Sequence, residues 1–221
     1  MEASVCVVIP LYKEQPSAGE LRSIRQACKV FAGRDIFYVI PQGMSISAYP
    51  FQAAYEFPRY YFQSVQTYSE LCCLNDLYRT FKDYEYMLIY QPDCWVFDDR
   101  LDYFCSLGYD YIGAPWPKMP GILEDGVGNG GFCLRRVAKF IELTRNLHDC
   151  GAHPEDRFWC IDMRDYLKIA PISVAATFSL EHNPERWFKK YGRVLPMGCH
   201  KPWRFNYDKF WKSKGVPSYE D

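Results

Sequence analysis

The sequence predicts a single α/β domain with a mixed, mostly parallel sheet and helices on both faces. A β-branched run at residues 4–9, helical spacing across 19–32 and an apolar run at 36–40 follow one another. This order is typical of a right-handed unit with two parallel strands. The apolar run at 86–90 predicts a buried central strand, which ends at Gln91-Pro92-Asp93 because proline interrupts strand pairing. A length of 221 residues suits one domain with a large core.

The remaining elements are predicted from local patterns, in chain order. They are a short strand at 59–62, a helix capped by Ser69 and running to Phe81, a strand at 94–97, a helix from 98 stopped by Gly108, a strand at 109–113, a loop from Ala114 to Gly126, a strand at 132–135, a helix at 137–147, a helix with Pro154 at its first position, a strand at 172–176, and a basic helix at 206–214. The loop is rich in Pro and Gly, and loops of its length are usually functional or mobile.

Composition narrows the classes of partner and compartment. A formal net charge of -1 provides no basic field for a polyanion, which argues against a nucleic-acid partner. Cys6, Cys94, Cys133 and Cys160 sit within apolar runs, where cysteine behaves as a small hydrophobe. With neither a signal peptide nor a long apolar span recognised, we expect a cytoplasmic protein with free thiols. The basic segment 201–214 is compatible with contact to an anionic membrane, although a solvated helix is the simpler interpretation.

Asp93 is the first candidate for chemistry. It follows the predicted central strand, and ligands of open α/β sheets bind at the carboxyl ends of strands. The alternative is an aspartate that only caps the next element. The loop containing Tyr12 and Lys13 follows the first strand, so we expect it at the same edge of the sheet.

Five sequence segments together resemble nucleotide-sugar glycosyltransferases of the GT-A fold. They read LIYQPDCWVF, YDYIGAPW, VGNGGFCLRR, PEDRFWC and GCHKPW. The resemblance spans about residues 5–205 and is greatest to small bacterial glycosyltransferase-like proteins catalogued as a domain of unknown function. It implies one GT-A-like, Rossmann-like domain, with a nucleotide-binding half at 1–97. Residues 98–221 would form the acceptor-side half and a C-terminal closing segment.

The resemblance also implies a divalent metal, Mn²⁺ or Mg²⁺. In the family a DxD motif ends the central strand, and its last acid binds the metal; Asp93 occupies that position here. His200 matches a histidine that completes the metal shell. Gln91 replaces the first acid, and an amide oxygen is a poorer ligand for a hard cation than a carboxylate, so the pattern leaves metal dependence open. His182 competes with His200, while His148 and His153 are interpreted as ordinary helix-flanking residues.

Donor-binding residues follow from the same resemblance. Pro10, Tyr12 and Lys13 match the loop that cradles the nucleotide, Gln91 and Asp93 lie beside the diphosphate, and Lys201 matches a lysine that contacts it. Trp116 is a candidate pocket wall. The Asn129, Gly130 and Gly131 turn matches a glycine-rich turn under the donor sugar, where a missing Cβ permits close approach. A plain tight turn is the alternative interpretation.

Glu155 and Asp156 resemble the acidic pair that supplies the general base in inverting members. Such a base takes the proton of the acceptor hydroxyl. The alternative is a pair of acids that interact with a helix dipole. His200-Lys201 favours retention and Glu155-Asp156 favours inversion, so the stereochemical outcome stays open.

The resulting expectation is transfer of a hexose from a nucleotide diphosphate sugar, with a UDP-sugar favoured, to a glycan or lipid-linked acceptor in bacterial surface polysaccharide synthesis. Two alternatives remain at this point. A nucleotidyltransferase would share the sheet and the metal, but residues 10–19 lack its Gly-rich, Lys/Arg-bearing signature. A non-catalytic sugar-binding module would tolerate Gln91 in place of an acid.

Overall fold

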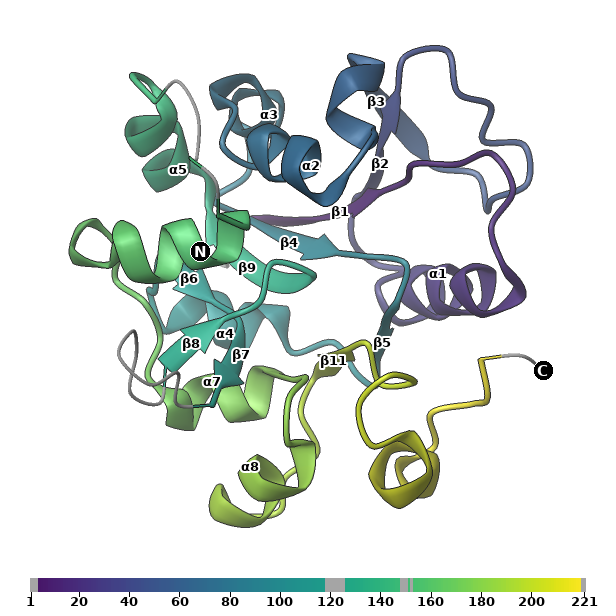
Figure 1. Ribbon diagram of the computed structural model, residues 1–221, viewed down its shortest axis with the longest axis vertical. Helices are drawn as coiled ribbons and strands as arrows, with labels where there is room; N and C mark the ends of the chain where they lie inside the picture. The colour runs from purple at the N-terminus through teal and green to yellow at the C-terminus, as the bar shows by residue number, and fades with distance from the viewer. Residues whose placement is uncertain (1–3, 118–125, 148–150, 152, 220–221) are drawn as a thin grey trace.

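A six-stranded mixed sheet forms the centre of the computed structural model, which describes residues 4–117, 126–147, 151 and 153–219 (Figure 1). Its strand order is β3-β2-β1-β4-β9-β6. The bounds are β1 Val5–Pro10, β2 Ile36–Pro41, β3 Ala53–Phe57, β4 Tyr86–Tyr90, β6 Tyr111–Ile112 and β9 Phe132–Arg136. The first four strands pair in parallel, whereas β9 is antiparallel to both β4 and β6. This arrangement confirms the predicted α/β class.

Helices cover both faces of the sheet. On one face lie α1 (Ala18–Val30), α4 (Leu101–Ser106) and α7 (Ile172–Phe178), and on the other lie α2 (Val65–Leu71), α3 (Asn75–Thr80) and α5 (Val137–Thr144). Strand β1 contributes Val5, Val7 and Ile9 to one apolar cluster and Cys6 and Val8 to the other. Burial on both faces explains why this strand reads as an uninterrupted apolar run.

A smaller layer closes the carboxyl edge of the sheet. Strands β10 (Ser179–Leu180), β11 (Gly198–His200) and β5 (Cys94–Val96) form a second sheet, and β7 (Ala114–Trp116) pairs with β8 (Gly126–Gly128). The other elements are η1 (Arg59–Phe62), α6 (Glu155–Arg157), η2 (Phe158–Asp162), η3 (Arg164–Tyr166), α8 (Pro184–Lys190), η4 (Tyr207–Trp211) and η5 (Lys212–Lys214). Because β5 pairs with β11, the chain just after Asp93 lies beside His200.

Capping residues fix where the helices nearest this edge begin. Ser17 and Glu20 form a reciprocal capping box at the start of α1, so two backbone N–H groups that the helix leaves unpaired find acceptors. Ser64 caps α2 through the backbone N–H of Thr67. The predicted cap Ser69 instead lies inside α2, where its hydroxyl donates to the carbonyl of Val65.

Several predicted elements were wrong in type or extent. Residues 59–62 form the 3₁₀ helix η1, and the edge strand precedes them as β3. The mostly apolar segment 172–176 belongs to α7, because Ala175 and Ala176 follow Ile172 at helical spacing and are buried. Periodicity in such short segments does not separate helix from strand. Segment 114–126 begins and ends in the hairpin strands β7 and β8, with 118–125 outside the described residues.

The remaining differences concern helix ends and short strands. The predicted helix 137–147 ends at Thr144, and 206–214 form a π turn followed by a 3₁₀ turn. Helix α8 and strands β10 and β11 were not predicted. The predicted placement of His148 lies outside the described residues, while Cys6, Cys94, Cys133 and Cys160 are buried free thiols, as predicted.

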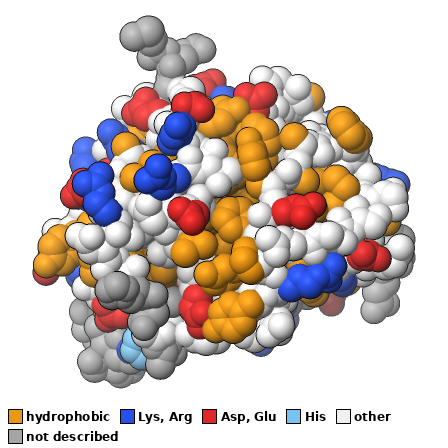
Figure 2. Space-filling model, turned by 90° about the horizontal axis from the view of Figure 1, so that it is seen from above, with side chains coloured by type: hydrophobic (Ala, Val, Ile, Leu, Met, Phe, Trp, Pro, Cys, Tyr) orange, Lys and Arg blue, Asp and Glu red, His pale blue; other side chains and the backbone are white. Residues whose placement is uncertain are grey.

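One face of the molecule exposes a band of apolar side chains. Figure 2 shows a band of hydrophobic side chains across the face seen from above, and the exposed large apolar residues include Tyr60 of η1 and Val65 of α2. Exposed apolar groups that gather on one face often mark a site of interaction. Within the described parts of the chain, no helix is both long and apolar enough to traverse a bilayer.

Candidate functional site

Two adjoining cavities open at the carboxyl edge of the central sheet. The first cavity, of about 450 Å³, is lined by Pro10, Leu11, Tyr12, Glu20, Phe62, Gln63, Ser64, Val65, Tyr68, Gln91, Pro92, Asp93 and Tyr219. The second cavity, of about 490 Å³, is lined by Val65, Tyr68, Ser69, Gln91, Trp116, Pro117, Asn129, Gly130, Gly131, Pro154, Glu155, Asp156, Arg157, Glu181, His182, His200 and Lys201. Val65, Tyr68 and Gln91 belong to both, so the cavities are two compartments of one cleft.

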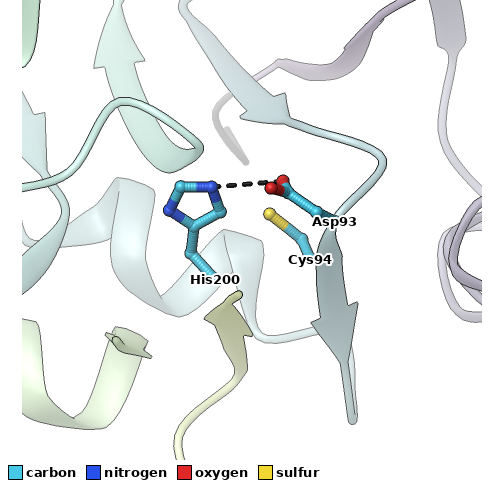
Figure 3. A group of neighbouring side chains, drawn as sticks. All are labelled: Asp93, Cys94 and His200. Carbon is cyan, nitrogen blue, oxygen red and sulfur yellow. Dashed lines mark ion pairs between the residues drawn. The ribbon is translucent and has the colours of Figure 1, made fainter. Parts of the chain in front are cut away.

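Asp93 and His200 meet where the two cavities join. Figure 3 shows the His200 ring pointing from β11 toward Asp93, with the Cys94 side chain below them. His200 Nε2 lies 3.2 Å from Asp93 Oδ1. The turn after β4 and the end of β11 are held together by the Lys201 N–H, which donates to the backbone carbonyl of Asp93. The contact therefore joins segments more than 100 residues apart in sequence.

Glu181 contacts the second ring nitrogen of His200. One carboxylate oxygen lies 3.1 Å from His200 Nδ1, and the other accepts a hydrogen bond of 3.0 Å from the amide of Asn129. Burial alone would lower the pKa of His200, but Asp93 and Glu181 outweigh it and raise that pKa to about 9. For the two acids, burial acts to raise the pKa, yet His200 leaves both pKa values below their usual range. The three groups thus form one electrostatic unit.

The residues present fit a divalent cation. Asp93 Oδ1 and His200 Nε2 are buried and lack an aligned hydrogen-bond partner among the described residues, although they lie close together. Carboxylate oxygen suits hard cations such as Mn²⁺ and Mg²⁺, and imidazole nitrogen is a common ligand of divalent transition metals. Cys94 lies within the same cluster, but its thiol donates to the carbonyl of Gly131 at 3.1 Å. Asp93 and His200 are therefore the two side chains that would hold the ion.

Gln91, at the position where the resemblance to GT-A enzymes predicts an acid, lines both cavities. Its neutral side chain lies near the Tyr68 hydroxyl of α2. This position therefore supplies an amide rather than a carboxylate.

The turn of Asn129, Gly130 and Gly131 forms the floor of the second cavity. Asn129 has a φ of 77° and is almost fully buried, and its side-chain oxygen accepts a hydrogen bond of 2.9 Å from the Gly131 N–H. A Cβ at Gly130 would overlap the Glu155 carboxylate, and one at Gly131 would overlap the His200 ring. Both glycines are thus required by close packing of the turn against site residues.

Glu155 and Asp156 line the second cavity but differ in their surroundings. Glu155 Oε2 lies 2.6 Å from Nη2 of the fully buried Arg135, which also donates to the Tyr78 hydroxyl. Burial raises the pKa of Glu155 to about 7, although Arg135 opposes the shift. This geometry gives Glu155 a structural partner, and its predicted catalytic role stays a prediction.

Asp156 has no cationic side chain bonded to it within the described part of the chain. Its carboxylate accepts hydrogen bonds from the backbone N–H groups of Gly130 and Arg157. Burial raises the pKa of Asp156 above its usual range despite these bonds. A partly buried carboxylate with a raised pKa is suited to accept a proton.

Most of the predicted site residues line this cleft. Pro10, Tyr12, Gln91 and Asp93 line the first cavity, and Trp116, the glycine turn, both acids, His200 and Lys201 line the second. Lys13 lines neither cavity, because its ammonium group lies 2.7 Å from Glu20 Oε2. His182 also lines the second cavity, 3.5 Å from Glu181 and packed on Phe205, whereas His153 lines neither.

Sequence reasoning missed Glu181, Glu20, Tyr68, Phe62 and Tyr219 as site residues. Glu181 directly follows strand β10, so the rule that singled out Asp93 would have found it had that strand been recognised. Glu20 carries a local signal, since Ser17 and Glu20 have the spacing of a capping box. The three aromatic residues carry no such signal.

A family model described as protein of unknown function (DUF5672) matches residues 52–200. The chain belongs to this family. The match runs from β3 through His200 and so includes the Asp93–His200 contact, Glu181 and every residue of the second cavity except Lys201, while Tyr12 and Tyr219 lie outside it. No curated protein matches the chain.

Among solved structures, this member of the DUF5672 family is similar to several glycosyltransferases at low identity. An active-site mutant of LgtC has a TM-score of 0.55 and 12% identity, with 96% of this chain and 98% of that one covered. A glycosyltransferase involved in glycosylation of the major capsid of PBCV-1 has a TM-score of 0.52 and 12% identity, covering 89% and 93%. GlyE from Streptococcus pneumoniae TIGR4, in its apo form, gives 0.51 and 15%, covering 98% and 61%. The fold is that of GT-A glycosyltransferases.

Proposed function

We propose that this protein is a glycosyltransferase that moves a hexose from a nucleotide diphosphate sugar, with a UDP-sugar as the favoured donor, to a hydroxyl of a glycan or lipid-linked acceptor. The observation that carries the proposal is the Asp93–His200 contact at the junction of two cavities of different character. A nucleotide sugar likewise has two unlike ends joined by a diphosphate. A structure of LgtC with donor and acceptor sugar analogues shares the fold, at 9% identity.

The first cavity has the chemistry expected for a nucleoside. Its described lining includes the rings of Tyr12, Phe62, Tyr68 and Tyr219 but no lysine or arginine. Planar bases stack on aromatic side chains, whereas phosphates need cations or N–H donors. The base and ribose therefore fit here, and the phosphates fit nearer to Asp93.

The second cavity has the chemistry expected for the diphosphate, the sugar and the incoming acceptor. Lys201 and Arg157 supply positive charge, and the glycine turn leaves room for close approach to the backbone. Asp93 and His200 would hold a divalent cation, which, when bound, stabilises negative charge on the departing nucleoside diphosphate. Lys201 adds a second cation next to that position.

Asp156 is the side chain best suited to take the proton of the acceptor hydroxyl. Its raised pKa brings its basicity closer to neutral pH, and the N–H of Gly130 orients one of its oxygens. Glu155 is paired with Arg135, so a structural role suits it better than the role of the base. A hexose as the transferred sugar and a place in bacterial surface polysaccharide synthesis remain predictions from the sequence.

A thermal-shift experiment with nucleotide diphosphate sugars tests the proposal. UDP-sugars with Mn²⁺ should raise the melting temperature of the wild-type protein, because a ligand that binds only the native state stabilises it by mass action. Asp93→Ala should remove the shift and the hydrolysis of the donor, whereas Asp165→Ala, an exposed aspartate of η3 outside both cavities, should keep them. The absence of any shift with any nucleotide sugar in the wild type would overturn the proposal.

A further inference from the structure

The segment Val216–Tyr219 lies against the first turn of α1, far from it in sequence. The Tyr219 hydroxyl lies 3.1 Å from Ser17 Oγ, and its ring packs so closely on Gly19 that a Cβ there would overlap it. Figure 1 shows the C-terminal trace returning to the side of α1. The segment is therefore docked on the helix rather than extended into solvent.

Three further contacts fix the segment. Arg22 of α1 donates to the carbonyl of Ser218, Trp203 Nε1 donates to the carbonyl of Pro217 at 2.7 Å, and the Tyr207 hydroxyl donates to the carbonyl of Val216. The rings of Trp203 and Tyr219 lie 4.9 Å apart. Hydrogen bonds at three consecutive carbonyls, together with ring packing, give this segment a defined path.

The hydroxyls of Tyr219 and Tyr12 both contact the capping box that Ser17 and Glu20 form. Glu20 accepts from the Tyr12 hydroxyl at 3.3 Å and from Ser17 Oγ at 2.8 Å, and Ser17 Oγ in turn contacts the Tyr219 hydroxyl. Lys13 neutralises the Glu20 carboxylate. The capping box of α1 thus anchors one tyrosine from the loop after β1 and one from the C-terminal segment, and both line the first cavity.

We infer that Val216–Tyr219 is a wall of the nucleoside compartment, with Tyr219 contributing an aromatic face for the planar base of a nucleoside diphosphate. The inference rests on the proposed function and extends it to a residue outside the part of the chain that the family model matches. The first cavity offers no described lysine or arginine, so the ring and the polar edge of the Ser17–Glu20 pair are what a base would meet on this side.

Calorimetric titration of the full-length protein with UDP and with pyrophosphate, both with Mn²⁺, tests the inference. Tyr219→Ala should weaken UDP binding roughly ten-fold, as expected for loss of one stacking side chain, and leave pyrophosphate binding unchanged. Tyr219→Phe keeps the ring and should stay within about two-fold to three-fold of wild type, because a stacking ring matters more than one hydroxyl contact. Tyr166→Ala, an exposed tyrosine of η3 outside both cavities, is the matched control.

Gly19→Ala provides a second, independent variant. It removes no side chain that lines the cavity, but its Cβ would displace the Tyr219 ring. It should weaken UDP binding as much as Tyr219→Ala, and the double variant should be no weaker than either. Melting curves of each variant verify that the chain is folded.

The outcomes separate this inference from the proposed function. If the wild type binds UDP and both variants bind it equally well, the segment is not part of the compartment, and the proposed function stands. Tighter binding by Tyr219→Ala would also overturn the inference, because the ring would then be an occupant of the compartment. If the wild type binds neither UDP nor pyrophosphate, the proposed function fails, and the inference fails with it.

Discussion

Glu181 Oε1 lies 3.1 Å from His200 Nδ1, while its second oxygen holds the amide of Asn129. One buried acid therefore orients both the histidine that faces Asp93 and the asparagine that shapes the glycine turn. Histidines that bind metals commonly have their second ring nitrogen fixed in this way by a carboxylate. Glu181 would therefore position the His200 ring toward an ion bound by Asp93 and His200, without contacting that ion.

Glu181→Ala is predicted to weaken Mn²⁺ binding about 10- to 100-fold, since loss of an outer-shell partner lets the imidazole ring turn away. Titration calorimetry with MnCl₂ measures the affinity. Glu185→Ala is the matched control, because Glu185 lies four residues later on α8 and pairs only loosely with Lys189. Equal Mn²⁺ affinity in the wild type and Glu181→Ala would contradict the positioning role.

The central sheet was predictable because its signal is local. Strands β1 and β4 are buried on both faces, so each is an unbroken apolar run, and the proline after β4 marks its end. The segment 172–176 gave a wrong strand because a five-residue segment with four apolar residues fits either period. Strands β10 and β11 were therefore not recognised, and Glu181, which directly follows β10, was not identified as a site residue.

The site was predictable where a residue lies directly before or after a strongly predicted strand, and not where tertiary packing decides. Asp93 and the Asn129–Gly131 turn belong to the first kind, and the structure brings them together with His200. Lys13 illustrates the second, because its pairing with Glu20 depends on how the loop folds back on α1. Tyr219 reaches the first cavity through tertiary contacts, among them packing on Gly19, which leave no pattern in the sequence.

Truncation of Glu155 is predicted to destabilise the fold. Glu155→Ala leaves the fully buried guanidinium of Arg135 without its carboxylate, and loss of one partner of a buried pair typically costs about 3–5 kcal/mol. Urea denaturation at about pH 8, above the pKa of about 7 so that Glu155 is ionised, measures the free energy of unfolding. Glu155→Gln is the control and should lose much less, because its amide oxygen can still accept from Arg135. If Glu155→Ala kept full stability but lost transferase activity, Glu155 would act in catalysis.

The pH dependence of stability should carry a signature of the same residue. Burial raises the pKa of Glu155 to about 7 in the native state, against 4.5 for an ordinary glutamate. Between these values the native protein holds a proton that the unfolded chain has released. The contribution of Glu155 to the free energy of unfolding is thus full below about pH 4.5 and is lost as pH rises toward about 7.

Urea denaturation of the wild type and Glu155→Gln across about pH 5 to 8 measures this contribution as a difference between the two proteins. Taking this difference cancels the contributions of other titrating groups to the free energy of unfolding. One such group is His200, whose pKa of about 9 lies above that of Glu155. The wild type should lose stability relative to the variant as pH rises. Parallel curves, or a relative gain by the wild type, would show that the carboxyl is ionised throughout.

Gly131 is predicted to be required for the Asp93–His200 contact itself. A Cβ at this position would overlap the His200 ring, so Gly131→Ala should push the imidazole away from Asp93. The variant should lose the increase in melting temperature that Mn²⁺ and UDP give the wild type. Gly33→Ala is the matched control, because a Cβ there meets nothing within 4 Å. If Gly131→Ala keeps the full Mn²⁺- and UDP-dependent shift, the ion does not depend on the position of the His200 ring, and His200 is not its ligand.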